Sequence, residues 1–381
     1  MENPFKYGAV ATGEYFTDRE EELADLELEM RSGQDVVIIS PRRYGKTSLL
    51  FQAMSHLRSE QMLVAYLDLL KTATKEQLVD HLATAIYNNL VAPVELAWQK
   101  AIDLFLKLPI RPKMTINPDS TPSFEFSAGG RSRDLDRTLE DLLALPGKVS
   151  SSRKRKVALV LDEFQEVVTI DPHLPALMRA IFQTQGDVCH VFAGSKRHLM
   201  QRVFTDENEP MYRMARIMAL REIPKSAFAA FIQDRFNKTG QRITEEAIQM
   251  MLDITGCHPH DTQELCHFTW ALAAIEKAEV TRDLVVRALE KVLDAEDARY
   301  TDRWEKLSAH QRLILVAVAN DGDASIYSEA YRRQHHLGAA STVQKAVSRL
   351  IEEEMMEASP KGGYRVPDPF FRTWLLRMSS C

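Results

Sequence analysis

The most constraining feature of the sequence is a short apolar run, 36–39, that ends directly at Ser40. The run is β-branched and uninterrupted, which is typical of a strand whose two faces are both covered in a parallel sheet. Residues 48–57 then carry apolar side chains at helical spacing, and 62–67 return to an extended pattern. The order predicts a β-α-β unit with a right-handed crossover and therefore a parallel sheet.

Strands and helices continue to alternate as far as Ser195, which is the pattern of an α/β fold. We expect further buried strands at 157–161 and 188–193, and helices at 74–91, 133–145 and 174–184. The segment 108–130 has four prolines before Phe124 and short alternating stretches, so it predicts a β-hairpin insertion. Residues 1–200 are therefore assigned to one α/β domain with a parallel sheet.

The second half of the chain has a different pattern. Helical periodicity without strand-like runs predicts an all-helical domain over 201–300, with helices at 227–237, 245–255, 262–278 and 282–295. Residues 301–381 predict three short helices at 304–319, 327–335 and 342–356, and a β-ribbon at 358–366. Three helices followed by a ribbon indicate a winged helix-turn-helix domain. A length of 381 residues accommodates three domains.

The composition narrows the environment and the partners. The chain has 48 Lys and Arg against 54 Asp and Glu, a formal net charge of −6, so nucleic-acid binding requires a local basic patch. None of the four cysteines forms a C-x-x-C pair, which fits a reducing compartment. The sequence has neither a leader-like N-terminus nor an apolar run long enough for a membrane helix. We expect a cytoplasmic protein without a membrane partner.

The turn between the first strand and its helix has the composition of a phosphate-binding loop. Backbone N–H groups at a helix N-terminus, together with the helix dipole, bind the oxygens of a triphosphate. Lys46 is expected to reach the β- and γ-phosphates, Thr47 to ligate Mg²⁺, and Gly45 to allow close approach of the backbone. The loop departs from the usual pattern at its first position, where Ser40 replaces glycine. The predicted nucleotide-binding residues of this segment are Ser40, Pro41, Arg42, Arg43, Tyr44, Gly45, Lys46, Thr47 and Ser48.

Three more polar residues follow predicted strands. Asp162 and Glu163 end the apolar run 157–161, and carboxyl ends of parallel strands form the edge where α/β sheets bind ligands. We expect Asp162 to hold Mg²⁺, directly or through water, and Glu163 to polarise the attacking water. Ser195 ends the next strand, where its hydroxyl is placed to sense the γ-phosphate. Glu163, Lys46 and Ser195 are therefore the predicted catalytic group.

Several segments together resemble the archaeal-type ATPases, P-loop proteins related to the AAA+ and STAND ATPases. They are 3–8, 16–23, 40–49, 161–165, 193–195, 210–213, 256–259 and 364–374. The resemblance implies ATP binding and slow hydrolysis, a helical lid, a C-terminal winged helix and nucleotide-dependent assembly into a homo-oligomer. It also implies that Phe16 lies at the adenine side and that His258 and Pro259 bring the lid onto the nucleotide. Arg213 and Arg216 are both candidates for an arginine acting in trans.

Other signals are weaker. Cys257, His258, His260, Cys266 and His267 lack the spacing of zinc ligands, so no metal site is predicted among them. The basic run 153–156 is typical of a solvated loop. From residue 301 onward the sequence has 11 Lys and Arg and 10 Asp and Glu, so this domain has almost no net charge. The presumed recognition helix ends in three glutamates. DNA and a protein partner therefore both remain open for this domain.

Two functions follow from these observations. The first is an Mg²⁺-dependent ATP-binding and ATP-hydrolysing switch that controls assembly or engagement of DNA or a protein through the winged helix. The second is a nucleotide-independent DNA-binding regulator built on a degenerate P-loop, which the serine at position 40 would favour.

Overall fold

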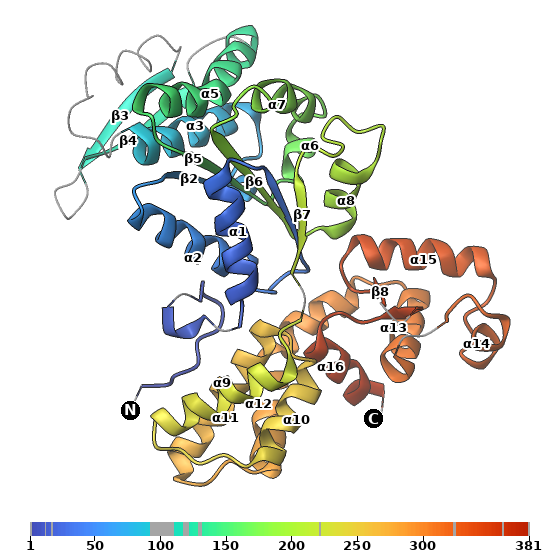
Figure 1. Ribbon diagram of the computed structural model, residues 1–381. Coiled ribbons are helices and arrows are strands. Elements are labelled where there is room, and N and C mark those ends of the chain that lie inside the picture. Colours follow the sequence, from blue (N-terminus) through green and yellow to red (C-terminus); the bar gives the residue numbers. More distant parts are fainter. Residues whose placement is uncertain are drawn as a thin grey trace. The chain divides into compact units, whose positions relative to one another are not determined.

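The computed structural model describes residues 2–11, 13–16, 18–91, 110–116, 122–128, 132–220, 222–322, 325–359 and 362–379. They form two compact units, shown in Figure 1. The first unit is Val10–Glu222, and the second combines Met1–Ala9 with Ile223–Cys381. None of the described helices combines the length and the apolar character needed to cross a bilayer.

The first unit is built on a five-stranded parallel sheet in the order β2-β5-β6-β1-β7. Its strands are β1 (Val36–Ile39), β2 (Leu63–Asp68), β5 (Val157–Asp162), β6 (Val188–Gly194) and β7 (Arg216–Ala219). Every residue of β1, β5 and β6 is buried, as expected for continuous apolar runs. The predicted α/β fold with a parallel sheet is confirmed.

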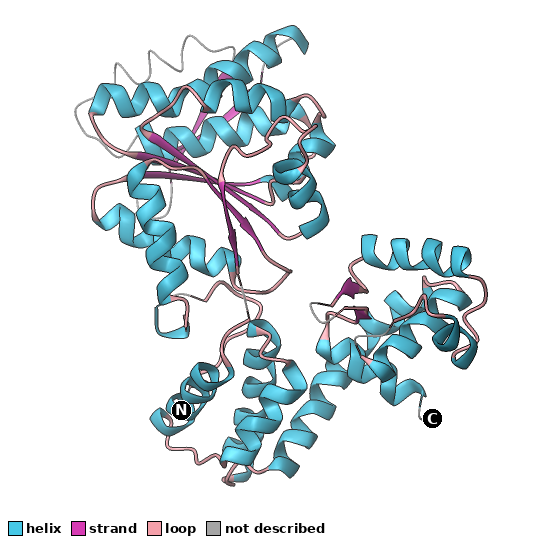
Figure 2. Cartoon of the chain, turned by 45° about the vertical axis from the view of Figure 1, so that its right-hand side comes forward, coloured by secondary structure: helices cyan, strands magenta, loops and turns pink. Residues whose placement is uncertain are grey.

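Helices cover both faces of this sheet, as Figure 2 shows. Val36 and Ile38 pack with one face, which is covered by α1 (Glu20–Ser32) and α2 (Lys46–Ser59). Val37 and Ile39 pack with the other face. That face is covered by α3 (Lys75–Ile86), α5 (Ser132–Arg153), α6 (Glu166–Ile170), α7 (Leu174–Phe182) and α8 (Arg197–Thr205). Single turns lie at Gly13–Tyr15, Leu69–Lys71 and Tyr87–Val91.

Several features of the first unit differ from the sequence prediction, which did not include α1, α6 and α8. The helix expected to end at residue 145 continues as α5 to Arg153, through Pro146, because Leu145 and Val149 on both sides of the proline are buried in the core. β7 was not predicted, because only Met218 of its four residues is buried. Within 108–130, β3 (Ile110–Ile116) and β4 (Pro122–Ala128) pair antiparallel.

The second unit contains a helical part and a winged-helix part that share one apolar core. The helical part comprises α9 (Lys225–Lys238), α10 (Glu245–Thr255), α11 (Pro259–Glu276) and α12 (Arg282–Glu305). Phe5 of the N-terminal segment is buried in the same core, and Asn3 Nδ2 donates to the carbonyl of His267 at 3.0 Å.

The winged-helix part contains a ribbon, as predicted, and four helices. They are α13 (Ala309–Asp321), α14 (Glu329–Gln334), α15 (Ala340–Glu352), β8 (Glu357–Ala358), β9 (Tyr364–Arg365) and α16 (Pro369–Ser379). The helix predicted over 304–319 is divided, because α12 continues to Glu305 and a new helix begins with a capping box between Ser308 and Gln311. α16 was not predicted. The expected boundaries at 200 and 300 fall inside α8 and α12.

Candidate nucleotide site

The predicted site residues lie at the carboxyl edge of the parallel sheet. The P-loop follows β1, the two acids follow β5, and Ser195 follows β6, which lies between β1 and β5. The register aligns Ile39 with Gly194 across the β1–β6 pair, so the P-loop and Ser195 leave the sheet side by side. Strand order therefore brings together residues more than 115 positions apart in the chain.

The P-loop leads directly into α2. Gly45 is the N-cap residue with φ of 82°, a left-handed conformation that favours glycine, and Lys46 is the first helical residue. The first turn of α2, which is described in full, carries no acidic side chain. Ser40 is 1% exposed and does not adopt a left-handed conformation, so the backbone here does not require glycine. Among the described residues, no group hydrogen-bonds to Ser40 Oγ.

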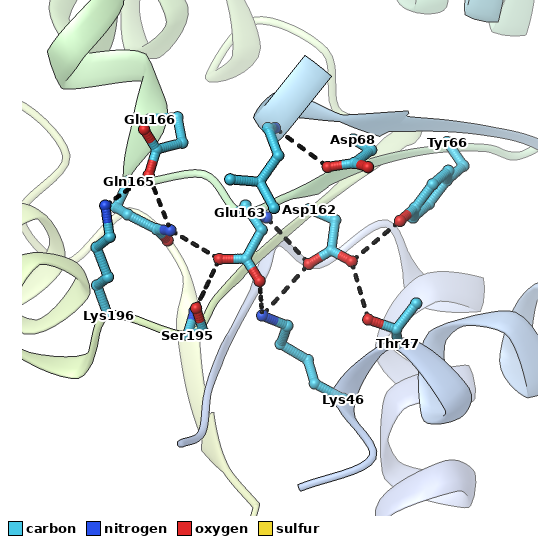
Figure 3. A network of polar contacts seen from close by, with 11 residues as sticks. Lys46, Thr47, Tyr66, Asp68, Asp162, Glu163, Gln165, Glu166, Ser195 and Lys196 are labelled. Atoms are coloured by element: carbon cyan, nitrogen blue, oxygen red, sulfur yellow. Dashed lines mark hydrogen bonds and ion pairs between the residues drawn. The ribbon is translucent and has the colours of Figure 1, made fainter. Parts of the chain in front are cut away.

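Lys46 and Thr47 meet the two carboxylates (Figure 3). Lys46 Nζ lies 2.9 Å from Glu163 Oε1 and 3.4 Å from Asp162 Oδ1. Thr47 Oγ1 donates to Asp162 Oδ2 at 3.2 Å. The side chains of Lys46 and Asp162 are nearly fully buried, so these contacts form in a medium that screens charge weakly. The arrangement gathers an ammonium group, a hydroxyl and two carboxylates within one polar cluster.

Glu163 is held by a second group of donors. Its backbone is left-handed, with φ of 53°, and its Oε2 accepts hydrogen bonds from Gln165 Nε2 at 2.7 Å and Ser195 Oγ at 2.8 Å. Burial alone would raise the pKa of Glu163. The Lys46 charge and the hydrogen bonds from Gln165, Lys46 and Ser195 outweigh burial and lower the pKa to about 2. The carboxylate is therefore ionised at neutral pH.

Two residues of this cluster were not predicted from the sequence. Tyr66 near the end of β2 donates its hydroxyl to Asp162 Oδ2 at 3.0 Å, and burial together with Asp162 raises the pKa of the phenol. Gln165 holds Glu163 as described above. Tyr66 carries a weak signal, since it is a polar side chain within an apolar strand. No local sequence pattern marks Gln165, because its contact with Glu163 depends on the left-handed turn at Glu163.

Comparison with known proteins gives the family. A pattern described as an ATPase domain predominantly from Archaea matches residues 16–265, about two thirds of the chain. The chain belongs to this ATPase family. A second pattern, a probable winged helix domain, matches residues 298–377 and confirms the predicted C-terminal fold. No curated protein is significantly similar to the chain.

Solved structures agree with the fold of this archaeal-type ATPase. A Walker-type ATPase of Pyrococcus abyssi is 18% identical, with a TM-score of 0.66, over 98% of this chain and 99% of that one. The ORC2 protein of Aeropyrum pernix, solved in ADPNP–ADP complexes, is 13% identical, with a TM-score of 0.56, over 99% and 100%. The ORC1 protein of Aeropyrum pernix, solved with DNA, is 13% identical, with a TM-score of 0.51, over 95% and 93%.

The other predicted residues are divided between the two units. Phe16 is partly buried and packs against the core that α1 and α2 share with the sheet, and Ser48 Oγ accepts a hydrogen bond from the backbone of Ala11 at 2.9 Å. His258 and Pro259 belong to the second unit, where Pro259 begins α11. Their predicted contact with the nucleotide stays a prediction. Arg42 and Arg43 are exposed, Pro41 is half-buried and Tyr44 is buried.

The two candidate arginines have different surroundings. Arg216 on β7 forms ion pairs with Asp25 and Glu29 of α1, so its charge is matched by neighbouring acids of the same unit. Arg213 is exposed, and its guanidinium lies 5.5 Å from the centroid of the Tyr212 ring. Which of them acts in trans stays a prediction.

The residues present fit a magnesium nucleotide. Thr47 and Asp162 supply the oxygen ligands that Mg²⁺ prefers, and they lie beside the lysine of the P-loop. The N-terminus of α2, whose first turn carries no acidic side chain, adds backbone donors suited to phosphate oxygens. Thr47 and Asp162 would hold the ion, which would supply positive charge to the phosphate oxygens.

The second unit contains a separate polar cluster at the start of α11. His258 Nδ1 lies 3.0 Å from Asp261 Oδ2, and His260 Nδ1 lies 3.1 Å from Asp261 Oδ1 and 3.7 Å from Glu264 Oε2. The ligand atoms of His260, Asp261 and Glu264 are close enough to surround an ion. Each of them already has a partner in this cluster.

The remaining candidates from the sequence have structural partners. Cys266 Sγ contacts Met251 Sδ at 3.7 Å, and His267 Nδ1 lies 2.9 Å from the carbonyl oxygen of Phe5. In the basic run, Arg153 donates to the carbonyl of Val91 at 2.8 Å, and Lys156 lies 2.8 Å from Asp187. These two basic side chains therefore have partners within the first unit.

Proposed function

We propose that this chain is a Mg²⁺-dependent molecular switch that binds and slowly hydrolyses ATP. The observation that carries the proposal is the contact of Lys46 and Thr47 of the P-loop with Asp162, the last residue of β5, and Glu163, which follows it. A lysine, a hydroxyl and two strand-end carboxylates at the N-terminus of a helix are the groups that phosphoryl transfer to water uses.

Each residue has a distinct role in this proposal. Backbone N–H groups of 40–48 bind the phosphates, and Lys46 turns from Glu163 to the β- and γ-phosphates. Thr47 and Asp162 hold the ion. Glu163, released from the lysine, accepts a hydrogen bond from the attacking water, and Ser195 senses the γ-phosphate. Arg213 from a neighbouring subunit stabilises the charge that develops on the transferred group.

The proposed regulation involves the rest of the chain. We assign 1–200 to an ATPase domain with a hairpin insertion, 201–300 to a helical lid and 301–381 to a winged helix, in the manner of AAA+ and STAND proteins. His258 and Pro259 close the lid on ATP but not on ADP. Closure promotes assembly into a homo-oligomer and presents the winged helix to DNA or a protein. The location that we propose for this switch is the cytoplasm.

The winged helix offers a polar surface for that partner. Gln344, Lys345, Ser348 and Arg349 lie on the exposed face of α15, opposite the buried Val343, Val347 and Leu350. Other basic side chains are engaged nearby, since Arg333 pairs with Glu329 and Arg365 with Glu357. A steep fall of DNA affinity with salt would indicate phosphate contacts, and a flat response would indicate a protein partner.

The proposal is tested by separating binding from turnover. Glu163→Gln keeps the shape of the side chain and removes its charge, so we expect ATP binding to persist while hydrolysis falls at least about a hundredfold. Glu60→Gln, at an exposed ion pair with Arg31 in the same unit, is the matched control and should hydrolyse normally. Normal turnover by Glu163→Gln would exclude the proposed chemistry.

Switching is tested by the molecular mass in solution with ADP and with a non-hydrolysable ATP analogue. A larger assembly with the analogue supports the proposal. The same mass with both nucleotides contradicts nucleotide-dependent assembly. Absence of any nucleotide binding would favour the nucleotide-independent DNA-binding regulator.

A further inference from the structure

Gln165 lies two residues after Glu163 and is 1% exposed. Its side-chain Nε2 is placed between two carboxylates, 2.7 Å from Glu163 Oε2 and 3.4 Å from Glu166 Oε1 (Figure 3). An NH₂ group donates and a carboxylate accepts, so these two neighbours fix which way the amide points. The nitrogen must face Glu163, because the opposite orientation would bring the amide oxygen against a carboxylate oxygen.

The opposite side of the amide is closed by packing. Among the described residues, no donor reaches Gln165 Oε1. A Cβ on Gly194 would lie 2.5 Å from this oxygen and 2.4 Å from Met200 Sδ, so glycine at 194 leaves the space that Gln165 occupies. A buried amide with one unsatisfied side is unfavourable for packing alone. Its hydrogen bond to Glu163 is the contact that distinguishes it from an apolar side chain of the same size.

The two oxygens of Glu163 face different partners. Oε1 faces Lys46 Nζ, whereas Oε2 accepts from Gln165 Nε2, from Ser195 Oγ and, at 3.3 Å, from Ser195 N. When Lys46 turns to a phosphate, the contacts that remain are all on Oε2. They prevent rotation of the carboxylate and leave Oε1 as the oxygen able to accept a hydrogen bond from water.

We propose that Gln165 is a positioning residue that fixes Oε2 of Glu163, so that Oε1 is directed at the water that attacks ATP. Gln165 touches neither substrate nor metal in this role and acts through Glu163. The inference rests on the proposed ATP hydrolysis. It predicts that removing the amide donor slows turnover without weakening the capture of nucleotide by Lys46 and the P-loop.

The test compares three variants of the full-length chain with wild type, measuring kcat, KM and the Kd of a fluorescent ATP analogue in Mg²⁺. Gln165→Met keeps the length and removes the donor, and Gln165→Glu replaces the donor by an oxygen. Gln185→Met is the matched control. Gln185 is also a buried glutamine of the first unit, with Nε2 2.8 Å from the carbonyl of Leu143 and an unpartnered Oε1 in the described structure.

We expect both Gln165 variants to lower kcat by about tenfold or more, with KM and Kd within about threefold of wild type. Gln185→Met should keep the wild-type kcat even where it lowers the melting temperature. If Gln165→Met does not fold, Gln165→Glu decides the result. A kcat within about twofold of wild type in a folded Gln165 variant, or an equal loss in Gln185→Met, would overturn the inference alone. A wild-type protein without hydrolysis would overturn the proposed function and this inference together.

Discussion

Two helices of the molecule begin in similar ways but differ in charge. A left-handed residue precedes each helix: Gly45 is the N-cap residue of α2, whereas Gly256 and Cys257 precede the extended N-cap residue His258 of α11. The first turn of α11 carries Asp261, which complements the helix dipole, while the first turn of α2 begins with Lys46. The carboxylates that offset Lys46 come instead from β5. The dipole of α11 is therefore complemented by an acidic side chain in its own first turn. The first turn of α2 has no such side chain, which leaves its N-terminus suited to an external anion.

The largest expected effect is at the proposed ion ligand of α2. Thr47→Val keeps a β-branched side chain and removes the hydroxyl that meets Asp162, so we expect kcat with Mg²⁺ to fall by about a hundredfold or more. Chelation of divalent ions by EDTA should lower wild-type turnover to the same level. Steady-state phosphate release measures both.

The control for this substitution is Thr84→Val on α3, whose hydroxyl donates only to the carbonyl of Asp80. It should hydrolyse ATP at the wild-type rate. A Thr47→Val protein that keeps full Mg²⁺-dependent activity would show that the hydroxyl is not an ion ligand.

The next largest effect is expected on the free energy of unfolding, at the polar cluster at the start of α11. Burial raises the pKa of Asp261, but hydrogen bonds and charges of His258 and His260 outweigh it and leave the pKa below its ordinary value. A depressed pKa contributes stability above the unfolded value of about 3.9, and the contribution is lost as the pH falls towards the folded value. Asp261→Asn should lower the free energy of unfolding by about 1–3 kcal/mol at pH 6.

Urea unfolding of both proteins between pH 6 and pH 3 checks this prediction. The difference between wild type and Asp261→Asn should narrow below about pH 4. The control variant is Asp253→Asn on α10. Asp253 is exposed and pairs with Lys225 of α9, so the substitution should change the free energy of unfolding little. A difference that grows as the pH falls would show that Asp261 is not stabilised in its ionised form.

The strands of this fold could be predicted where burial is complete, and the one strand of the sheet that was missed, β7, lies where burial is partial. Residues 36–39 and 157–161 are apolar throughout because both sheet faces are covered. β7 is an edge strand with Arg216 and Ile217 exposed, so no apolar run marks it. α5 continues past Pro146 because tertiary packing of Leu145 and Val149 overrides a local helix breaker.

The residues of the site also fall into two groups, those that a local sequence pattern marks and those that only the folded chain brings to the site. Lys46, Thr47, Asp162, Glu163 and Ser195 follow strands, and strand ends of one parallel sheet meet at one edge, so their proximity could be predicted. Gln165 and Tyr66 contact the carboxylates through the left-handed turn at Glu163 and the pairing of β2 with β5. Neither feature is encoded by a local sequence pattern.

A smaller effect is expected at Ser40, where the P-loop departs from its usual glycine. Because Ser40 is not left-handed, Ser40→Gly should leave the Kd for ATP within about threefold of wild type. It should be about 0.5–1 kcal/mol less stable than Ser40→Ala, because glycine loses more conformational entropy on folding. A tenfold gain in ATP affinity with glycine would instead show that the serine impairs the loop.

The smallest effect is expected for Arg216→Ala. Its ion pairs with Asp25 and Glu29 are exposed, so we expect a loss of at most about 0.5–1 kcal/mol and unchanged turnover. Arg213→Ala should keep the stability of wild type and lower the turnover of the assembled protein. The opposite pattern, with turnover lost only in Arg216→Ala, would assign the role in trans to Arg216.

The central claim is that Lys46 marks a site for the triphosphate, and the most direct test is a titration of ATP in Mg²⁺ against wild type, Lys46→Ala and Lys156→Ala. Lys156 forms an exposed ion pair with Asp187 in the same unit, so its variant controls for the loss of one positive charge. Circular dichroism should first show that all three proteins are folded. The account predicts saturable binding by wild type and Lys156→Ala and at least a hundredfold weaker binding by Lys46→Ala. Equal affinity in all three, or binding by none, would contradict it.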